Sequence, residues 1–370
     1  MSSSREQFLK DPLAYLDSSF NGVDPVTISP YQLCIGDPPT ARKVLANAGD
    51  LYDTPAFFAE ERFGRRHQQT ALRAHTRALF RHHLDSITGD ALARAVDANI
   101  TASSDWPDAG NSFFVHLFRF VLLYEGSPRR LSWLIEDVLR ATLAGAASRT
   151  PRWKVRLFIF KRTWLLSGEI KFRKRARSQT PRDFLDAIIS VAEPHQSDTE
   201  LTDVFAALVA SISTLGFVLG WAVYLLGTEG DPGARIPSEW IVCEALRLWP
   251  LSWLMGRIAK QSHEVAGRRI KPGDEVIACP YLVNRHKDYW PDATQFRPER
   301  WADPQSFRNP AFLSFGYGTH RCPFADHATE VVSRAVDVLR ARGFTVLPKK
   351  TLRPLGPIIY PPAFTLHLND

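Results

Sequence analysis

A stretch of uncharged and mostly apolar residues, 204–226, constrains the fold of this chain more than any other feature. A helix needs about 20 apolar residues to cross a bilayer, so length alone would allow a membrane span. The flanks argue against it, because Asp203 precedes the stretch, Glu229 follows it, and no Lys/Arg cluster marks one side. Hydroxyl groups in its middle would also need partners in lipid (Ser211, Ser213 and Thr214). We therefore predict a long helix that is buried on all sides in a large core.

The composition is that of a folded protein with a sizeable core. Of 370 residues, 45% are hydrophobic and 11% aromatic, which excludes a disordered chain. The cysteines lie far apart, contain no C-x-x-C pair and are too few for a disulfide framework (Cys34, Cys243, Cys279 and Cys322). A zinc ribbon is therefore not indicated, and sparse cysteine favours a reducing cytoplasm. The first residues contain no long apolar run, so we expect no secretion signal.

The chain is moderately basic, with 46 Lys and Arg against 39 Asp and Glu and a formal charge of +7. This balance is compatible with an acidic partner or an anionic surface, but it does not by itself indicate nucleic-acid binding. Cations are densest in residues 152–177, where aromatic residues lie between them. Binding to nucleic acid or to a membrane is one interpretation of that segment. We favour an amphipathic helix pair with solvated cationic faces, because no nucleic-acid-binding module accompanies it.

The hydrophobic periodicity predicts a mostly α-helical chain with a small β region, an α+β fold. Several segments have helical spacing (40–49, 65–97, 113–145, 238–249 and 324–343). Other segments have the texture of strands (24–30, 31–37, 257–287, 344–348 and 364–368). Because no internal repeat and no credible linker divides the sequence, we predict a single large domain over residues 1–370.

The segment from Phe315 to Cys322, Phe-Gly-Tyr-Gly-Thr-His-Arg-Cys, is the most informative for chemistry. Its two glycines allow the backbone to turn tightly and to approach a flat or bulky group. His320 and Arg321 place positive charge beside the cysteine, and a predicted helix follows it. Both features favour a thiolate, which is what a soft metal requires of an axial ligand. An inert buried cysteine in a glycine turn is the alternative.

This loop resembles the haem-binding motif of the cytochrome P-450 family, F-G-x-G-x-H/R-x-C. Upstream, Glu244 to Arg247 matches the E-x-x-R helix motif of that family, and Phe296 to Trp301 matches its P-E-R-F/W segment. Each motif is weak alone, but the three occur in the family's order over about 80 residues. The resemblance covers roughly residues 10–370 and implies a cytochrome P-450-like fold.

The resemblance also implies a cofactor and a set of site residues. The cofactor would be haem b, with Cys322 as the thiolate ligand of the iron and with Phe315 and Gly316 in the haem-binding loop. A buried charge triad would lie behind the haem (Glu244, Arg247 and Arg300). Three cationic side chains would reach the haem propionates (Arg73, Arg257 and His320).

The long apolar stretch then corresponds to the family's helix on the distal haem face. Residues Ala210 to Thr214 align with the motif A/G-G-x-D/E-T, which implies catalytic roles for Ser213 and Thr214. Thr214 keeps the alcohol, but Ser213 replaces the acid and Ser211 replaces the glycine. A further departure is Phe324, where the haem-binding motif normally ends in Gly. An acid and an alcohol together relay protons in such a site. Because the acid is missing here, the sequence does not identify the group that supplies the proton.

The function implied by the resemblance is oxidation of a small organic substrate, a secondary-metabolite intermediate, by a monooxygenase that activates O2. Oxidative coupling, cyclisation or peroxide-dependent oxidation is one alternative, and a non-catalytic recruitment module is another. We expect a cytoplasmic monomer that receives electrons from a ferredoxin or flavodoxin and its reductase. We expect it to bind neither nucleic acid nor a membrane. The net charge of +7 would attract an acidic electron carrier.

Overall fold

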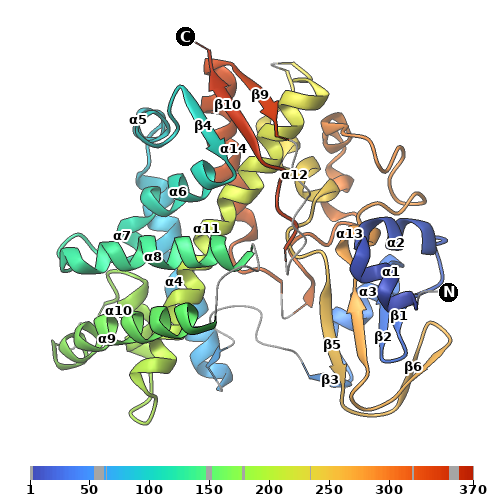
Figure 1. Ribbon diagram of the computed structural model, residues 1–370, viewed down its shortest axis with the longest axis horizontal. Helices are drawn as coiled ribbons and strands as arrows, with labels where there is room; N and C mark the ends of the chain where they lie inside the picture. The colour runs from blue at the N-terminus through green and yellow to red at the C-terminus, as the bar shows by residue number, and fades with distance from the viewer. Residues whose placement is uncertain are drawn as a thin grey trace. The chain divides into compact units, whose positions relative to one another are not determined.

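Helices dominate the structure and small sheets accompany them, which confirms the predicted α+β class (Figure 1). The computed structural model describes residues 3–53, 62–63, 65–146, 152–176, 180–233, 235–318, 321–349 and 358–369. The chain divides into two compact units. Unit 1 comprises Met1–Pro55, Glu229–Ala325 and Pro357–Ile359; unit 2 comprises Ala56–Thr228, Asp326–Gly356 and Tyr360–Asp370. The single domain over residues 1–370 stays a prediction.

Unit 1 contains a five-stranded sheet, whose strands come from residues 26–53 and from residues 255–278. The strand order is β1-β2-β8-β5-β3 (Val26–Ser29, Gln32–Ile35, Glu275–Ala278, Met255–Ala259 and Tyr52–Asp53). The β2–β8 pair is parallel, with Cys34 opposite Ile277, and the other pairs are antiparallel. A separate hairpin lies between β5 and β8 in the chain (β6, His263–Val265, and β7, Arg268–Ile270). The strands expected in residues 24–37 and 257–287 are therefore confirmed.

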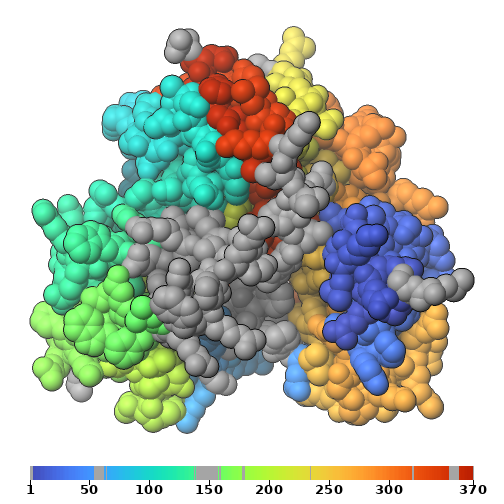
Figure 2. Space-filling model, in the orientation of Figure 1, coloured from blue at the N-terminus to red at the C-terminus, as the bar shows by residue number. Residues whose placement is uncertain are grey.

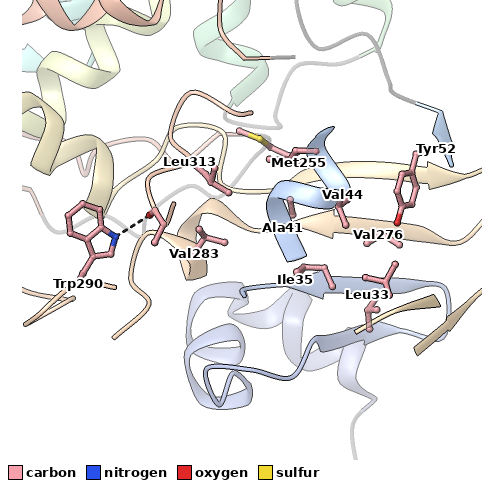
Figure 3. Close-up of a cluster of buried hydrophobic side chains, with 14 of the residues drawn as sticks. Leu33, Ile35, Ala41, Val44, Tyr52, Met255, Val276, Val283, Trp290 and Leu313 are labelled. Carbon is pink, nitrogen blue, oxygen red and sulfur yellow. Dashed lines mark hydrogen bonds between the residues drawn. The ribbon is translucent and has the colours of Figure 1, made fainter. Parts of the chain in front are cut away.

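Helix α3 (Pro38–Ala46) packs its apolar side on this sheet (Figure 3). The Asp37 carboxylate accepts a hydrogen bond from the Thr40 N–H at 2.9 Å, and Pro38 occupies the first turn, where its missing N–H costs nothing. The helix ends at Asn47, whose φ of 48° is left-handed. Val44 is 2% exposed, and it lies in one cluster with Leu33 and Val276 of the sheet.

The remaining elements of unit 1 are helices. They are two N-terminal helices (α1, Ser4–Lys10, and α2, Pro12–Ser19), α12 (Ser238–Leu248), α13 (Pro280–Val283) and two 3-10 helices (η2, Pro298–Ala302, and η3, Pro304–Arg308). Helix α12 packs against η2. The helix predicted over residues 238–249 is thus confirmed, apart from its last residue.

Unit 2 holds most of the helices and a three-stranded antiparallel sheet of order β4-β10-β9 (Ser103–Trp106, Phe364–Leu368 and Phe344–Pro348). Its shorter helices are α5 (Gly89–Asn99), α6 (Asp108–Leu117), α7 (Arg119–Leu122) and α10 (Phe184–Val191). Its longer helices are α4 (Arg66–Ser86), α8 (Arg129–Ala146), α9 (Arg152–Ala176), α11 (Asp198–Glu229) and α14 (Ala325–Arg342). The last two strands and the last helix agree with the predictions from the sequence.

Helix α11 contains the apolar stretch and is longer than predicted. Among the described helices, it alone is long and apolar enough to cross a membrane, but 78% of its most apolar window is buried within the protein. Gly216 lets α6 approach closely, because a Cβ on Gly216 would lie 2.2 Å from the Asn111 backbone nitrogen. The predicted long helix is confirmed and most of it is buried, but not on all sides as predicted, because Ser211 is exposed.

The basic segment differs from its prediction. Residues 152–176 form the single continuous helix α9 rather than a helix pair. It packs against α8 and α10. Three of its interleaved aromatic residues lie on the outside with the cations (Phe160, Trp164 and Phe172). The predicted helix pair is therefore wrong, whereas the predicted solvated cationic side is present and shares its surface with exposed aromatic residues.

Candidate functional site

The loop before α14 is shaped by two left-handed glycines and by its own hydrogen bonds. Gly316 and Gly318 have φ values of 74° and 70°, a region that favours glycine. The Cys322 N–H donates to the Phe315 carbonyl at 2.8 Å, which closes the loop onto its first residue. A Cβ on Gly318 would lie 3.2 Å from the Ala46 Cα, so a side chain there would crowd α3.

Cys322 differs in exposure from the other three cysteines. It is partly exposed, whereas Cys34, Cys243 and Cys279 are buried. A hydrogen bond with Cys279 and burial raise the pKa of the Cys34 thiol, and burial raises the pKa of Cys243. Both groups therefore remain protonated at neutral pH and are poor metal ligands. Cys322 lies three residues before α14 begins, where the helix N-terminus favours a negative charge.

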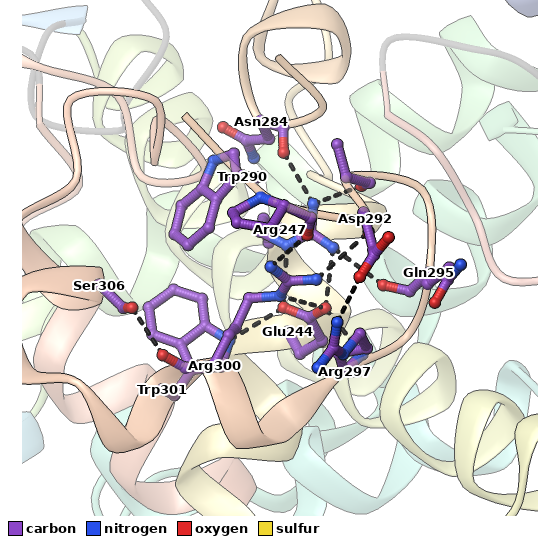
Figure 4. A network of polar contacts seen from close by, with 12 residues as sticks. Glu244, Arg247, Asn284, Trp290, Asp292, Gln295, Arg297, Arg300, Trp301 and Ser306 are labelled. Carbon is purple, nitrogen blue, oxygen red and sulfur yellow. Dashed lines mark hydrogen bonds and ion pairs between the residues drawn. The ribbon is translucent and has the colours of Figure 1, made fainter. Parts of the chain in front are cut away.

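Behind this loop, unit 1 contains a buried charge network (Figure 4). Glu244 and Arg247 of α12 are both fully buried and form a bidentate ion pair, with two N–H···O distances of 2.8 Å. Arg300 Nε lies 3.1 Å from Glu244 Oε1. Burial lowers the pKa of Arg300, and the Glu244 carboxylate opposes that shift. The structure thus brings together the three residues that the sequence proposed as a triad.

Every donor of Arg247 has an acceptor. Besides Glu244, its guanidinium donates to three backbone carbonyls at 2.9, 2.6 and 3.1 Å (Asn284, Ala293 and Gln295). Since a guanidinium has five N–H groups, none is left unsatisfied. The Glu244 carboxylate also accepts from the Trp301 indole N–H at 3.0 Å and from the Arg297 backbone N–H at 2.9 Å. The desolvation of these charges is therefore offset by hydrogen bonds.

A second set of bonds connects this network to the cysteine loop, and the sequence did not reveal it. The Asn284 amide donates to Ser314 Oγ at 2.8 Å, and its oxygen accepts from the Leu313 N–H at 2.8 Å. Ser314 in turn donates to the Leu246 carbonyl of α12 at 2.8 Å. Asn284 and Ser314 are thus positioning residues for the start of the loop. No sequence signal singled them out, because their partners lie 29 to 68 residues away.

The other candidates of unit 1 lie on β5 and in the loop. Arg257 is 2% exposed on β5, opposite Val276 of β8, and its Nη1 donates to the Gly256 carbonyl at 2.9 Å. Phe315 and Gly316 are partly exposed. His320 lies outside the described residues.

The remaining candidates belong to unit 2. Arg73 is partly exposed on α4, one position after the buried Leu72. On α11, Ser213 is fully buried and donates to the Ala210 carbonyl at 2.7 Å. Thr214 is partly exposed and donates to the Ser211 carbonyl at 2.7 Å. The two adjacent hydroxyls therefore point to different surroundings.

Helix α11 has one incompletely covered face, which the sequence did not predict. It comprises residues spaced by three or four positions (Asp203, Ala207, Ala210, Ser211 and Thr214). Four of the five side chains are small or carry a hydroxyl group. The acid on this face, Asp203, is ion-paired with Arg162 of α9. Thr214 Oγ1 on this face keeps its capacity to accept a hydrogen bond, while its own O–H donates to the Ser211 carbonyl.

Part of the sequence is similar to that of known proteins. A profile of the family described as Cytochrome P450 matches residues 237–323. Pentalenene oxygenase of Streptomyces avermitilis is 28% identical over 225 residues, which cover 52% of this chain and 50% of that protein. Cyclooctatin synthase of Streptomyces melanosporofaciens is 30% identical over 169 residues, 38% of this chain and 37% of that protein. The matches thus span half or less of these curated relatives.

Two solved structures share the fold over nearly the whole chain. P450BioI in complex with an acyl carrier protein superposes with a TM-score of 0.74 at 16% identity, covering 98% of this chain and 100% of that one. A zebra fish cytochrome P450 with progesterone gives 0.73 at 18% identity and covers both chains fully. The chain therefore has a cytochrome P450 fold, and its residues 237–323 match the model of that family.

The cofactor of that family is haem with a cysteine-bound iron, and the residues of this chain fit it. Cys322 is partly exposed and lies in a glycine loop three residues before the N-terminus of α14.

Proposed function

We propose that this chain is a haem-thiolate monooxygenase whose iron ligand is Cys322. The observation that carries the proposal is the Cys322 loop: a partly exposed cysteine, held by its N–H to Phe315, immediately before an 18-residue helix. Haem ligated by a thiolate supplies oxygen activation, because the thiolate donates electron density that favours O–O cleavage. The protein's own residues hold the cofactor and direct protons and substrate.

The charge network fixes the position of the thiolate. Glu244, Arg247 and Arg300 form the triad, and Asn284 transmits its geometry to Leu313 and Ser314 at the start of the loop. Arg257, Arg73 and His320 are proposed to bind the propionates, and Phe315 and Gly316 to contact the macrocycle. These roles rest on the family motifs together with the buried cation Arg257 of unit 1.

Thr214 is proposed as the hydroxyl that hands a proton to the reacting oxygen. Its Oγ1 lies on the open face of α11 and can both accept and donate a proton. Ser213 is proposed as a second hydroxyl of the proton route, for which its O–H would have to leave the Ala210 carbonyl to which it donates at 2.7 Å. Thr214→Ala is expected to lower product formed per NAD(P)H and to raise peroxide release, whereas Thr214→Ser should retain coupling.

One observation favours a second candidate, oxidative coupling, cyclisation or peroxide-dependent oxidation. The only carboxylate on the open face of α11, Asp203, is already paired with Arg162. A reaction that needs less proton delivery would suit such a face. If Thr214→Ala leaves coupling unchanged and hydrogen peroxide supports full turnover, this second candidate replaces conventional hydroxylation.

The proposed substrate is a lipophilic intermediate of secondary metabolism. Support comes from the names of the relatives, which include pentalenene oxygenase and cyclooctat-9-en-7-ol 5-monooxygenase. The proposed electron donor is an acidic ferredoxin or flavodoxin with its reductase, which the charge of +7 would attract. A monomeric, cytoplasmic protein completes the proposal.

The test is cofactor binding by wild-type and cysteine variants. The reduced CO adduct of the purified protein should show the red-shifted Soret band of thiolate ligation. Cys322→Ala should abolish that band, whereas Cys243→Ala, at a buried cysteine, should keep it. Survival of the band in Cys322→Ala would disprove the ligand assignment. A folded protein that refuses haem would instead support the non-catalytic recruitment module.

A further inference from the structure

Helix α9 exposes four large apolar side chains along one side, which we call the stripe. Phe160, Trp164 and Phe172 are 69%, 70% and 64% exposed, and Leu157 is 59% exposed. Their spacing of three, four and eight residues places them on one side of the helix. A stripe of this kind is unusual on a soluble surface, because exposed apolar residues are normally scattered. Figure 2 shows the described part of α9 and α10 in light green at the surface.

The rotation of α9 is fixed by charges on the opposite side. Arg173 is 2% exposed and binds three carboxylates at 2.7 to 2.8 Å (Glu169, Asp183 and Asp186). Arg162, also buried, pairs with Asp203 of α11. Rotating α9 by half a turn about its own axis would expose these buried charges to solvent and break their ion pairs. The ion pairs of Arg173 and Arg162 thus determine which side of α9 is buried, and the aromatic side is left facing outward.

The outward side is also uniformly cationic. Between the apolar residues lie three exposed cations (Lys161, Lys171 and Arg175). Residues 152–176 contain nine Lys and Arg and a single acid, Glu169, which is buried against Arg173. The described part of the stripe thus offers apolar bulk and positive charge but no carboxylate.

We propose that α9 docks the protein on the surface of an anionic lipid bilayer, which replaces the expectation from the sequence that it binds no membrane. Helices that lie in such an interface bury Trp, Phe and Leu in it and use Lys and Arg to bind anionic lipid; α9 carries both kinds of side chain on its exposed side. The lysine and arginine stems can extend to the headgroups while the rings enter the acyl boundary. An acidic protein is less well matched, because the cores of protein interfaces are depleted in Lys. Here Lys161 and Lys171 lie within the apolar stripe itself.

The test is flotation of the haem-loaded protein with lipid vesicles. One set is pure phosphatidylcholine and the other contains equal parts of phosphatidylcholine and phosphatidylglycerol. Wild-type protein should float with the anionic set only. Raising the salt concentration should weaken binding, because exposed charges are screened beyond about 10 Å at 0.1 M salt.

Two variants separate the apolar and electrostatic contributions. The triple variant Phe160→Ser, Trp164→Ser and Phe172→Ser should lower the partition coefficient at least about tenfold, through lost apolar burial. A charge variant, Lys161→Gln, Lys171→Gln and Arg175→Gln, should lose about fivefold for each cation removed. The control replaces three equally exposed apolar residues outside α9 by serine (Leu9, Val23 and Tyr31) and should bind like wild type. Circular dichroism checks that all variants are folded.

Three results would overturn the proposal. The first is wild-type protein that stays with the buffer in both vesicle sets. The second is equal binding by the control and by the serine variant of the stripe. The third is absence of vesicle binding together with a protein complex that depends on the stripe. That complex would be a salt-sensitive one with a purified acidic ferredoxin, or a dimer on gel filtration, and the serine variant of the stripe would not form it. The last case would assign the stripe to a protein partner.

Discussion

The indole of Trp301 allows a quantitative test of the buried charge network. Trp301 is 1% exposed, and its Nε1–H donates to Glu244 Oε2 at 3.0 Å. Trp290 provides a matched comparison, because it is 2% exposed and lies 5.6 Å from Trp301, but its Nε1–H donates to a neutral acceptor, the Ala311 carbonyl, at 3.1 Å. Replacing either residue by Phe removes one hydrogen bond and a similar amount of buried ring, and Phe at position 290 keeps an aromatic ring facing Arg247, whose guanidinium lies 5.4 Å from the Trp290 ring centroid.

The two substitutions should differ in cost because the acceptors differ in charge. A hydrogen bond to a charged group contributes about 1.5–3 kcal/mol, and one between neutral groups about 0.5–1.5 kcal/mol. The loss of ring volume is common to both variants and cancels in the comparison. Trp301→Phe should therefore lower the free energy of unfolding by about 1 kcal/mol more than Trp290→Phe. For a chain of this size, that corresponds to about 2 °C in melting temperature.

Urea and thermal unfolding followed by far-ultraviolet circular dichroism provide the measurement, since this signal does not depend on the tryptophans that are changed. Equal losses in the two variants, or a larger loss in Trp290→Phe, would show that the indole N–H adds nothing special to the Glu244 charge. The network would then be held by its arginines alone.

Four other substitutions test further features of the same structure. Arg247→Ala leaves a buried carboxylate without its main partner, which costs about 3–5 kcal/mol; the expected result is insoluble or haem-free protein, and soluble, fully loaded protein would contradict it. Gly216→Ala places a Cβ 2.2 Å from the Asn111 backbone nitrogen and should lower the free energy of unfolding by about 1–3 kcal/mol. In Gly168→Ala the new Cβ meets no atom within 4 Å, so the free energy of unfolding should rise by about 1 kcal/mol. Thermal unfolding measures both changes. Burial lowers the pKa of His83 below its ordinary 6.5; the unfolded chain therefore takes up a proton first as the pH falls below 6.5, stability drops over that range, and His83→Gln should flatten the drop in urea titrations.

Local spacing explains why part of the site could be predicted. Glu244 and Arg247 are three residues apart on one helix, so any helical fold places their side chains on the same side. The long uncharged stretch had to be buried because its flanks and hydroxyl groups did not suit lipid, and α11 is indeed largely buried. The loop glycines were predictable from the need for a tight turn, and their φ values are left-handed.

Other features could not be read from the pattern because their partners are distant in sequence. Trp301 reaches Glu244 across 57 positions, and Asn284 reaches Ser314 across 30. Hydrogen bonds of this kind depend on how helices and loops pack, which no local periodicity encodes. Ser213 and Thr214 are adjacent in sequence, yet only the packing around α11 shows that one is buried and the other is not.

The basic helix shows most clearly what each level determines. The sequence alone determined that residues 152–176 would be helical, aromatic and strongly cationic. It could not determine which side faces outward, because apolar residues occur all around the helix. Only the tertiary structure decided this, by giving Arg173 three carboxylates from α9 and α10. Burying that charge with its partners is favourable only in one rotation, and Phe160, Trp164 and Phe172 are left outside as a consequence.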